Sequence, residues 1–239
     1  MTKAILITGA GARIGKVLAK GLADDGWAVG VHYNRSEKSA QDLAETLGKN
    51  CAAVGANLNV PAERDSLVAR ASEALGTPLT ALINNASTFD PDEVDSFTSA
   101  GFDHHMDVNL KAAVLLSQQF AAVLPAGENG VIINMIDQRA LRPAPDYFTY
   151  ALSKAALLAA TKTMAQALAP RVRVCGIGPG AALQNTHQST EDFNAEIKAS
   201  LLGTGSPPGT ILDAARYLLS ASAVTGQMIA VDGGEHLIF

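Results

Sequence analysis

The sequence has little cysteine, little charge and no long apolar run. Cys51 and Cys175 are separated by a spacing that fits neither a metal site nor a redox pair, so both are expected to be reduced core residues. Charged residues make up 17% of the chain, no Lys/Arg run occurs and the net charge is −5, which argues against a nucleic-acid surface. No apolar stretch approaches transmembrane length, and Met1–Thr8 is too short and strand-like for a signal peptide. A cytoplasmic protein without nucleic-acid or membrane partners is predicted.

The sequence also lacks the spacing of a metal site. His104 and His105 are adjacent, so they point to different sides of their helix and make a poor metal pair. The neighbouring carboxylates are interpreted as a solvated loop, and they are Asp90, Asp92, Glu93 and Asp95. No catalytic metal is predicted.

Apolar strand-like runs alternate with segments of helical periodicity along residues 1–239, and no linker or repeat interrupts them. Strands are expected near Ala4–Thr8, Trp27–Tyr33, Cys51–Asn57, Ala81–Asn84, Val131–Ile136, Val172–Ile177 and Gln227–Val231. Helices are expected at Arg13–Asp25, Glu37–Leu47, Ala62–Leu75, Ala100–Val123, Phe148–Leu168 and Thr210–Ala221, with Gln188–Leu202 as a further helix and candidate lid. The pattern predicts one α/β domain of Rossmann type, a doubly wound seven-stranded parallel sheet with helices on both faces, whose ligands bind beyond the carboxyl ends of the strands.

The first strand is followed by a glycine-rich turn, Thr8-Gly9-Ala10-Gly11-Ala12-Arg13-Ile14-Gly15. Glycines there let backbone N–H groups approach a pyrophosphate at the start of the next helix. The spacing is one residue longer than the common dinucleotide fingerprint, and a tight turn without ligand is the alternative. Its place after the first strand of a βαβ unit favours a nucleotide.

The second strand ends in His32-Tyr33-Asn34-Arg35-Ser36, with no acidic residue to hold a free ribose 2′-hydroxyl. The Arg35 guanidinium suits a 2′-phosphate, and Ser36 and His32 add hydrogen-bond donors. Arg35 could instead be a solvated charge at a strand end. The missing carboxylate favours NADP.

Two further segments carry candidate side chains. Asn85 follows the fourth strand, where it can brace backbone or hold a ribose, and Phe89 offers an aromatic face or simply packs. Asn109 lies in mid-helix, where Asn is unfavourable unless its side chain has a task, such as holding a water that connects to Lys154.

Tyr150 and Lys154 are four residues apart on a predicted helix, so they share one face. The ammonium would favour the phenolate and lower the tyrosine pKa from about 10 toward neutral pH, as acid–base catalysis requires. Asp137 closes the preceding strand. An exposed helical Tyr and Lys without function is the alternative for this pair alone.

Taken in order, these motifs together with Pro179-Gly180 and the final Asp232-Gly233-Gly234 resemble the short-chain dehydrogenase/reductase family. The resemblance implies that Tyr150 donates a proton, that Lys154 binds the cofactor ribose and lowers the tyrosine pKa, and that Asn109 holds a structural water. It also implies a set of cofactor-binding residues, which are Gly9, Gly11, Arg13, Ile14, Gly15, His32, Arg35, Ser36, Asn57, Leu58, Asn85, Ala86, Tyr150, Lys154, Pro179 and Gly180.

Four departures from the family pattern together resemble its pteridine reductase branch. Arg13 replaces a glycine, Asp137 replaces a serine, Ser87 replaces another glycine with Phe89 two residues on, and the second strand ends in His-Tyr-x-Arg-Ser. The resemblance implies that Arg13, Ser87 and Phe89 line the substrate site with Asp137 and Tyr150, and that Asp137 joins a proton relay. An ionised Asp137 would raise the tyrosine pKa, so a protonated or water-linked Asp137 is expected, and reduction should weaken as pH rises.

The prediction is an NADPH-dependent reductase of a pterin, including a dihydropteridine or folate. One alternative is a generic carbonyl reductase, such as a 3-oxoacyl-carrier-protein or small-ketone reductase, in which Arg13 and Asp137 form an ion pair. The other is a non-catalytic NADP-binding regulator. The resemblance implies a homotetramer, to which the apolar tail Leu237-Ile238-Phe239 could contribute a subunit contact.

Overall fold

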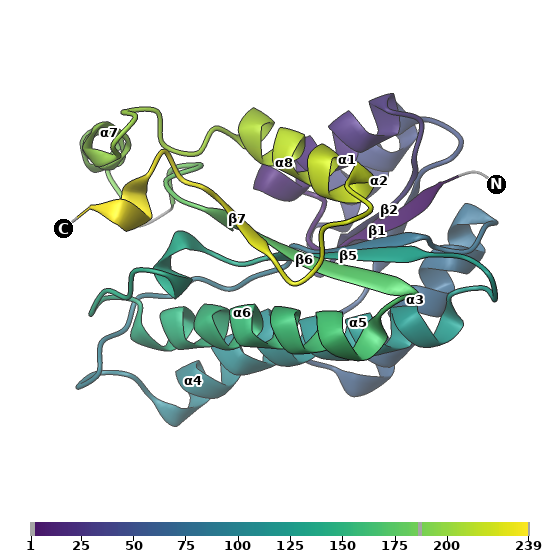
Figure 1. The fold of residues 1–239 in the computed structure, drawn as a ribbon, viewed down its shortest axis with the longest axis horizontal. Helices are drawn as coiled ribbons and strands as arrows, with labels where there is room; N and C mark the ends of the chain where they lie inside the picture. Colours follow the sequence, from purple (N-terminus) through teal and green to yellow (C-terminus); the bar gives the residue numbers. More distant parts are fainter. Residues whose placement is uncertain (1–2, 186–187, 239) are drawn as a thin grey trace.

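A computed structural model describes residues 3–185 and 188–238 of the chain. Seven strands form one parallel sheet, as the alternation of strands and helices predicted (Figure 1). Their order in the sheet is β3-β2-β1-β4-β5-β6-β7. The strands are β1 (Ala4–Ile7), β2 (Ala28–Tyr33), β3 (Ala52–Gly55), β4 (Ala81–Asn84), β5 (Gly130–Met135), β6 (Val172–Pro179) and β7 (Met228–Val231).

Helices cover both faces of this sheet. One face carries α1 (Arg13–Asp24), α2 (Glu37–Leu47) and α8 (Pro208–Ser220), and the other carries α3 (Pro61–Leu75), α5 (Ala112–Val123) and α6 (Phe148–Leu168) (Figure 1). Alternate residues of β1 supply the two cores: Ile5 and Ile7 pack toward the first layer, Ala4 and Leu6 toward the second. Strands buried on both faces in this way read as continuous apolar runs.

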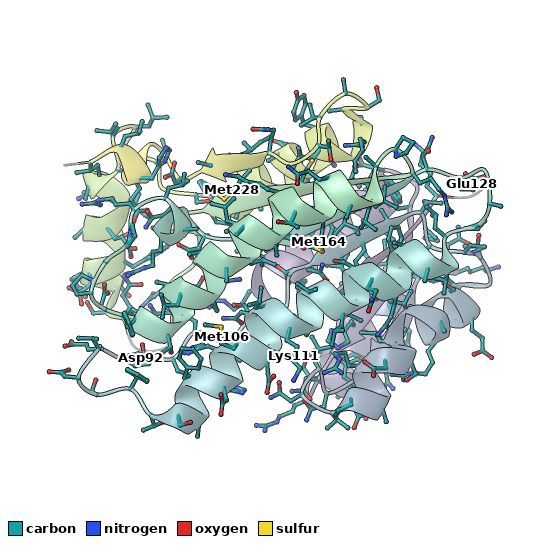
Figure 2. All side chains as sticks on the ribbon, turned by 60° about the horizontal axis from the view of Figure 1, so that its bottom comes forward. Asp92, Met106, Lys111, Glu128, Met164 and Met228 are labelled. Atoms are coloured by element: carbon teal, nitrogen blue, oxygen red, sulfur yellow. The ribbon has the colours of Figure 1, made fainter. Side chains whose placement is uncertain are left out.

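The long helix predicted at Ala100–Val123 is interrupted. It divides into α4 (Ser99–His105), a π-helical segment η1 (Met106–Lys111) and α5, which runs beside α6 (Figure 2). A π segment inserts an extra residue into a helical turn and often marks a functional site. Here it turns Asn109 inward, leaving that residue 1% exposed.

The remaining elements gather around the carboxyl ends of the strands. They are α7 (Thr190–Ala199), within the predicted lid segment, and two short 3₁₀ helices, η2 (Gln138–Ala140) and η3 (Glu235–Leu237). Neither Cys51 nor Cys175 forms a disulfide. Throughout the described ranges, every helix is too short or too polar to cross a bilayer.

Candidate active site

A cavity of about 690 Å³ opens at the carboxyl edge of the sheet, where the strand order reverses between β1 and β4. Open α/β sheets bind ligands at this reversal. The cavity is lined by all the residues that the sequence placed in the cofactor and substrate sites, whereas Asn109 lies behind its wall.

The glycine-rich turn between β1 and α1 has almost no room for side chains. Gly9 takes a left-handed conformation with φ +64°, and a Cβ on Gly15 would lie 2.3 Å from the carbonyl oxygen of Gly9. Arg13 also has a positive φ of 50° although it carries a side chain, which costs about 1 kcal/mol. The chain therefore keeps the backbone conformation that glycine favours while replacing the glycine.

The Arg13 side chain explains what the replacement adds. Its guanidinium donates hydrogen bonds to the carbonyl oxygens of Leu183 and Gln184, both at 2.9 Å. This links the glycine-rich turn to the segment that follows β6. The ion pair of Arg13 with Asp137, raised as an alternative from the sequence, is absent from the described residues.

His32 has a different task from the one the sequence predicted. Its Nδ1 accepts the Gly9 N–H at 2.9 Å, and its Nε2 lies 3.0 Å from the carbonyl oxygen of Ala56, to which it therefore donates. Burial lowers the pKa of this imidazole to about 4. A neutral ring with both nitrogens occupied offers no donor to a phosphate, so His32 pins the turn, while Arg35 and Ser36 stand exposed at the cavity rim.

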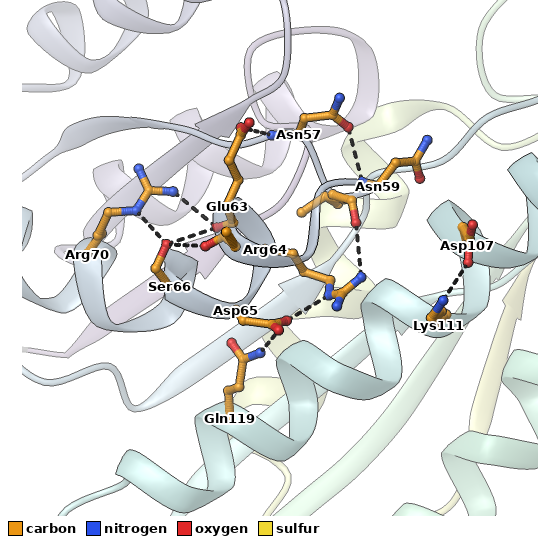
Figure 3. Close-up of polar contacts among 12 residues, drawn as sticks. Asn57, Asn59, Glu63, Arg64, Asp65, Ser66, Arg70, Asp107, Lys111 and Gln119 are labelled. Carbon is orange, nitrogen blue, oxygen red and sulfur yellow. Dashed lines mark hydrogen bonds and ion pairs between the residues drawn. The ribbon is translucent and has the colours of Figure 1, made fainter.

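The segment after β3 is held from α3 (Figure 3). The Asn57 N–H donates to Glu63 Oε2 at 2.7 Å, and the Asn57 side-chain oxygen accepts the Asn59 N–H at 3.0 Å. Arg64, only 6% exposed, reaches the carbonyl oxygen of Leu58 at 3.5 Å. Asn57 and Leu58 thus line the cavity on a braced backbone.

Asn85 performs the bracing role considered from the sequence. Its side-chain amide donates to the carbonyl oxygens of Thr8 and Gly9 at 2.8 and 3.3 Å. The backbone N–H groups of Asn85 and Ala86 donate to the Thr8 hydroxyl at 2.8 and 2.9 Å. These bonds fasten the end of β4 to the turn after β1.

Tyr150 and Asp137 meet at the centre of the cavity. The Tyr150 hydroxyl donates to Asp137 Oδ2 at 2.7 Å, while Asp137 Oδ1 accepts the Arg139 N–H at 2.8 Å and so caps η2. The Lys154 ammonium donates to the carbonyl oxygen of Met135 at 2.8 Å and lies 5.6 Å from the Tyr150 ring centroid. The three predicted catalytic side chains are therefore together.

Burial is the largest cause of the pKa shifts of Asp137, Tyr150 and Lys154. It raises the pKa of Asp137, and burial together with the Asp137 carboxylate holds the pKa of Tyr150 well above 10. Burial lowers the pKa of Lys154 to about 8, against an opposing pull from Asp137. The prediction that Lys154 lowers the tyrosine pKa is therefore wrong for this arrangement, whereas the predicted effect of an ionised Asp137 on the phenol is confirmed in direction.

Phe89 has an aromatic neighbour that the sequence did not single out. Tyr147 stacks on it with ring centroids 4.0 Å apart and an interplanar angle of 6°, while Tyr150 meets its edge at 4.6 Å and 82°. Arg139 lies 5.3 Å from the Tyr147 centroid. Phe89 thus forms part of an aromatic wall beside the Tyr150–Asp137 pair, with Tyr147 covering one of its faces.

Asn109 does not hold the predicted water with its side chain. Its side-chain oxygen accepts from the Thr88 N–H at 2.8 Å and the Ser87 hydroxyl at 3.0 Å. Its amide group donates to the carbonyl oxygen of Thr88 at 3.1 Å and the Ser153 hydroxyl at 3.0 Å. Two donors and two acceptor positions are thereby used. The side chain fastens the Ser87–Thr88 turn to α6.

Three polar residues that line the cavity were not predicted from the sequence, namely Gln138, Glu196 and Glu235. Glu235 accepts from the Gln138 amide at 3.0 Å and from the Ala181 N–H at 3.3 Å, and Glu196 of α7 lines the same end. Burial, reinforced by the charge of Glu196, raises the pKa of Glu235 to about 7. The only available signal was the position of Glu235 directly after Asp232-Gly-Gly.

The loop after Phe89 also differs from expectation. Asp92 is not part of a solvated acidic loop, because its side chain bonds Thr149 at the start of α6. His104 and His105 do diverge: His104 Nδ1 lies 3.2 Å from the Asn59 amide, and His105 is buried against Thr149. Within the described ranges, no group of three or more His, Cys, Asp or Glu residues forms a candidate metal site.

The fold, the glycine-rich turn and the Tyr150–Lys154 pair agree with a family comparison: residues 3–195 match the model for short chain dehydrogenases. The chain belongs to that family and is an oxidoreductase of the short-chain dehydrogenase/reductase type.

Within the family, the chain resembles pterin and folate reductases. It is 31% identical over 237 residues to dihydromonapterin reductase of Shigella sonnei, covering 98% of this chain and 96% of that protein. FolM alternative dihydrofolate reductase 1 from Brucella canis, solved with NADP, is 38% identical with a TM-score of 0.96, covering 99% and 95% of the two chains. The Brucella suis counterpart, also solved with NADP, is 37% identical with a TM-score of 0.92, covering 99% and 96%.

Proposed function

We propose that this protein is an NADPH-dependent reductase of a dihydropteridine or a related pterin. The observation that carries the proposal is the Tyr150–Asp137 hydrogen bond beside the aromatic wall of Phe89 and Tyr147. A pterin is flat and polar, so it suits a slot with a ring on one side and exchangeable protons at its edge. The similarity to dihydromonapterin reductase and to the Brucella reductases supports the same substrate class.

The other end of the cavity suits NADP. Gly9, Gly11 and Gly15 line the cavity without side chains beside the start of α1, which suits close approach by a pyrophosphate. Arg35 and Ser36 supply a cation and a hydroxyl for a 2′-phosphate. When bound, NADPH supplies the hydride.

The proton comes from the Asp137–Tyr150 pair. Because burial raises both pKa values, the pair holds a proton at neutral pH. When hydride reaches a ring carbon of the substrate, a ring nitrogen takes this proton, and solvent later restores it. Across their 2.7 Å contact either residue can replace the proton that the other gives up. The Lys154 ammonium lies close enough to stabilise the transient negative charge, completing an Asp–Tyr–Lys relay.

The test is NADPH consumption with dihydropterins, dihydrofolate and simple ketones, compared between the wild type, Tyr150→Phe and Asp137→Ser. We expect pterin turnover to fall by about 100-fold or more in both variants, since general acid catalysis contributes 10²–10⁴. Retained NADPH binding is the control for folding. Full pterin turnover in Asp137→Ser would refute the relay.

The same screen separates the alternatives. A generic carbonyl reductase would reduce ketones faster than pterins and would tolerate Asp137→Ser. A non-catalytic regulator would bind NADPH and consume it with none of these compounds.

We also propose a cytoplasmic homotetramer, in line with the resemblance to the family. Several large apolar side chains are exposed on the outer helices and the tail, namely Val123, Leu152, Tyr217 and Leu237. Isolated apolar residues on a monomer surface are ordinary, but such residues on outer helices also suit subunit contacts. Light scattering that returned a monomer would contradict the tetramer.

A further inference from the structure

The helix that carries the proton donor has no local cap. Tyr147, which precedes α6, has a positive φ of 53°, and its side chain does not cap the helix. The missing acceptors come from a distant loop. The Asp92 carbonyl oxygen accepts the Phe148 N–H at 3.2 Å, and Asp92 Oδ1 accepts the Thr149 N–H at 3.0 Å. The residue after Thr149 is Tyr150.

Asp92 also ends a hydrogen-bond chain whose direction is fixed. The Asp90 N–H can only donate, and it donates to His105 Nε2 at 3.2 Å. His105 Nδ1 must then carry the ring proton, which it donates to the Thr149 hydroxyl at 2.7 Å. The Thr149 hydroxyl in turn donates to Asp92 Oδ2. Both Asp92 side-chain oxygens therefore accept, Oδ1 from the Thr149 N–H and Oδ2 from the Thr149 hydroxyl, which a carboxylate can do and an amide cannot.

This series of hydrogen bonds lies directly against the candidate active site. The His105 ring is 1% exposed and packs edge-on to Tyr150 with centroids 6.1 Å apart. Burial lowers the pKa of His105, and the charges of His104 and Lys154 act in the same direction. The charges of Asp92 and Asp90 oppose this shift but do not cancel it, so the ring is neutral. Asp92 lies on the loop before α4, near the start of α6 (Figure 2), three residues after Phe89 of the aromatic wall.

We propose that Asp92 is a positioning residue for the reduction: it caps α6 from a distant loop and, through Thr149 and His105, fixes the first helical turn so that the Tyr150 hydroxyl meets Asp137. The catalytic part rests on the proposed function, whereas the positioning of Tyr150 does not. A misplacement of about 1 Å costs roughly 100-fold in rate, so loss of the cap acts on turnover more than on cofactor binding.

The experiment compares Asp92→Ala, Asp92→Asn and Thr149→Val with Asp95→Asn, a control on an exposed residue of the same loop. We expect Asp92→Ala to lower kcat for the dihydropterin by about 10-fold or more, with the NADPH Kd within about twofold of wild type. Asp92→Asn should also lower kcat, because its amide N–H faces the Thr149 hydroxyl and leaves that hydroxyl proton without an acceptor. Because Thr149→Val removes the hydroxyl that lacks an acceptor, the double variant Asp92→Asn/Thr149→Val should recover most of the kcat lost in Asp92→Asn. A double-mutant cycle measures this coupling.

A spectroscopic measurement covers the outcome in which no substrate is found. Tyrosinate absorbance during alkaline titration, with Tyr150→Phe as the reference, reports the Tyr150 pKa in each variant. In Asp92→Ala we expect this pKa to fall toward about 10 as the phenol leaves Asp137 and becomes solvated. No turnover by the wild type would defeat the proposed function alone. An unchanged Tyr150 titration, or an unchanged kcat in Asp92→Ala, would overturn the positioning role.

Discussion

Single residues in this site owe their protonation to burial more than to pairwise charge. Lys154 is 2% exposed and Tyr150 6% exposed, and each has a pKa displaced toward its neutral form. The neutral phenol suits donation of a proton. The lysine pKa of about 8 places loss of the ammonium within reach of a pH profile.

The alkaline limb of kcat/KM should therefore lie near pH 8 in the free enzyme, with activity falling as pH rises. Below that pH Lys154 is charged. Above it the side chain is neutral and no longer stabilises the transient negative charge on the Asp137–Tyr150 pair. The Asp137 carboxylate opposes the effect of burial on Lys154 by raising its pKa, so Asp137→Asn should move the limb of the residual activity to lower pH. Movement to higher pH would show that another group sets the limb.

Glu235 should make stability depend on pH. Its pKa rises from 4.5 unfolded to about 7 folded, so between these values the folded protein binds more protons than the unfolded chain. Stability from this group is complete below about 4.5 and is lost as pH rises through about 7. Glu235→Gln should accordingly raise Tm more at alkaline than at acidic pH, measured by thermal unfolding. Glu191→Gln, an exposed change in α7, is the control and should leave the difference in Tm between alkaline and acidic pH as it is in the wild type.

At the scale of elements, the site depends on how closely the turns approach one another. The turn between β1 and α1 touches the end of β4 through Asn85 and reaches the segment after β6 through Arg13. Gly15 lies at the tightest point, with the Gly9 carbonyl oxygen and the Asn85 amide both within 3 Å of a Cβ position. The carbonyl oxygen belongs to the backbone and cannot swing aside.

Gly15→Ala should therefore displace the whole turn. We expect a loss of about 1–3 kcal/mol in the free energy of unfolding, as overpacking usually produces, together with a weaker NADPH affinity. Urea unfolding and titration of cofactor fluorescence measure the two effects. Gly26→Ala tests whether the effect is local. Its positive φ carries a strain of its own, but a Cβ there meets no atom of the described residues within 4 Å, so NADPH binding should be retained.

The elements also show which features a sequence can reveal. The seven-stranded parallel sheet, the ligand site at its carboxyl edge and most of the cavity lining follow from alternating patterns and from motifs at strand ends, which are local signals. The π-helical interruption, the Asp92 cap and the Tyr147 stack depend on contacts between residues far apart in the chain. The same limit applies to His32 and Asn109, whose residue types were informative although their hydrogen-bond partners were set by tertiary packing.

Across the whole molecule, the cavity is electrically asymmetric. Arg35 stands at the end assigned to the cofactor phosphate, while Glu196 and Glu235 stand at the opposite end, beyond Asp137 and Tyr150. The nearby Arg139 does not offset them, because Asp146 pairs with it at 2.8 Å. Arg13 also lines the cavity, with its guanidinium on the carbonyl oxygens of Leu183 and Gln184, so the charge pattern opposes an anion only beside Glu196 and Glu235.

A substrate with an anionic tail should therefore react less well than one with a neutral side chain. We expect a dihydropterin with a neutral polyol to have a higher kcat/KM than dihydrofolate, whose glutamate carries two carboxylates. Because Glu196 is half-buried, its repulsion of a carboxylate is about 1 kcal/mol, so Glu196→Gln should raise kcat/KM for dihydrofolate roughly fivefold and leave the neutral pterin unchanged. The Gln188 side-chain amide donates a hydrogen bond to Glu196 Oε2 at 2.7 Å, and a glutamine oxygen at position 196 can still accept it. Glu191→Gln on the outer face of α7 is the matched control, and an equal gain in both variants would assign the effect to overall charge.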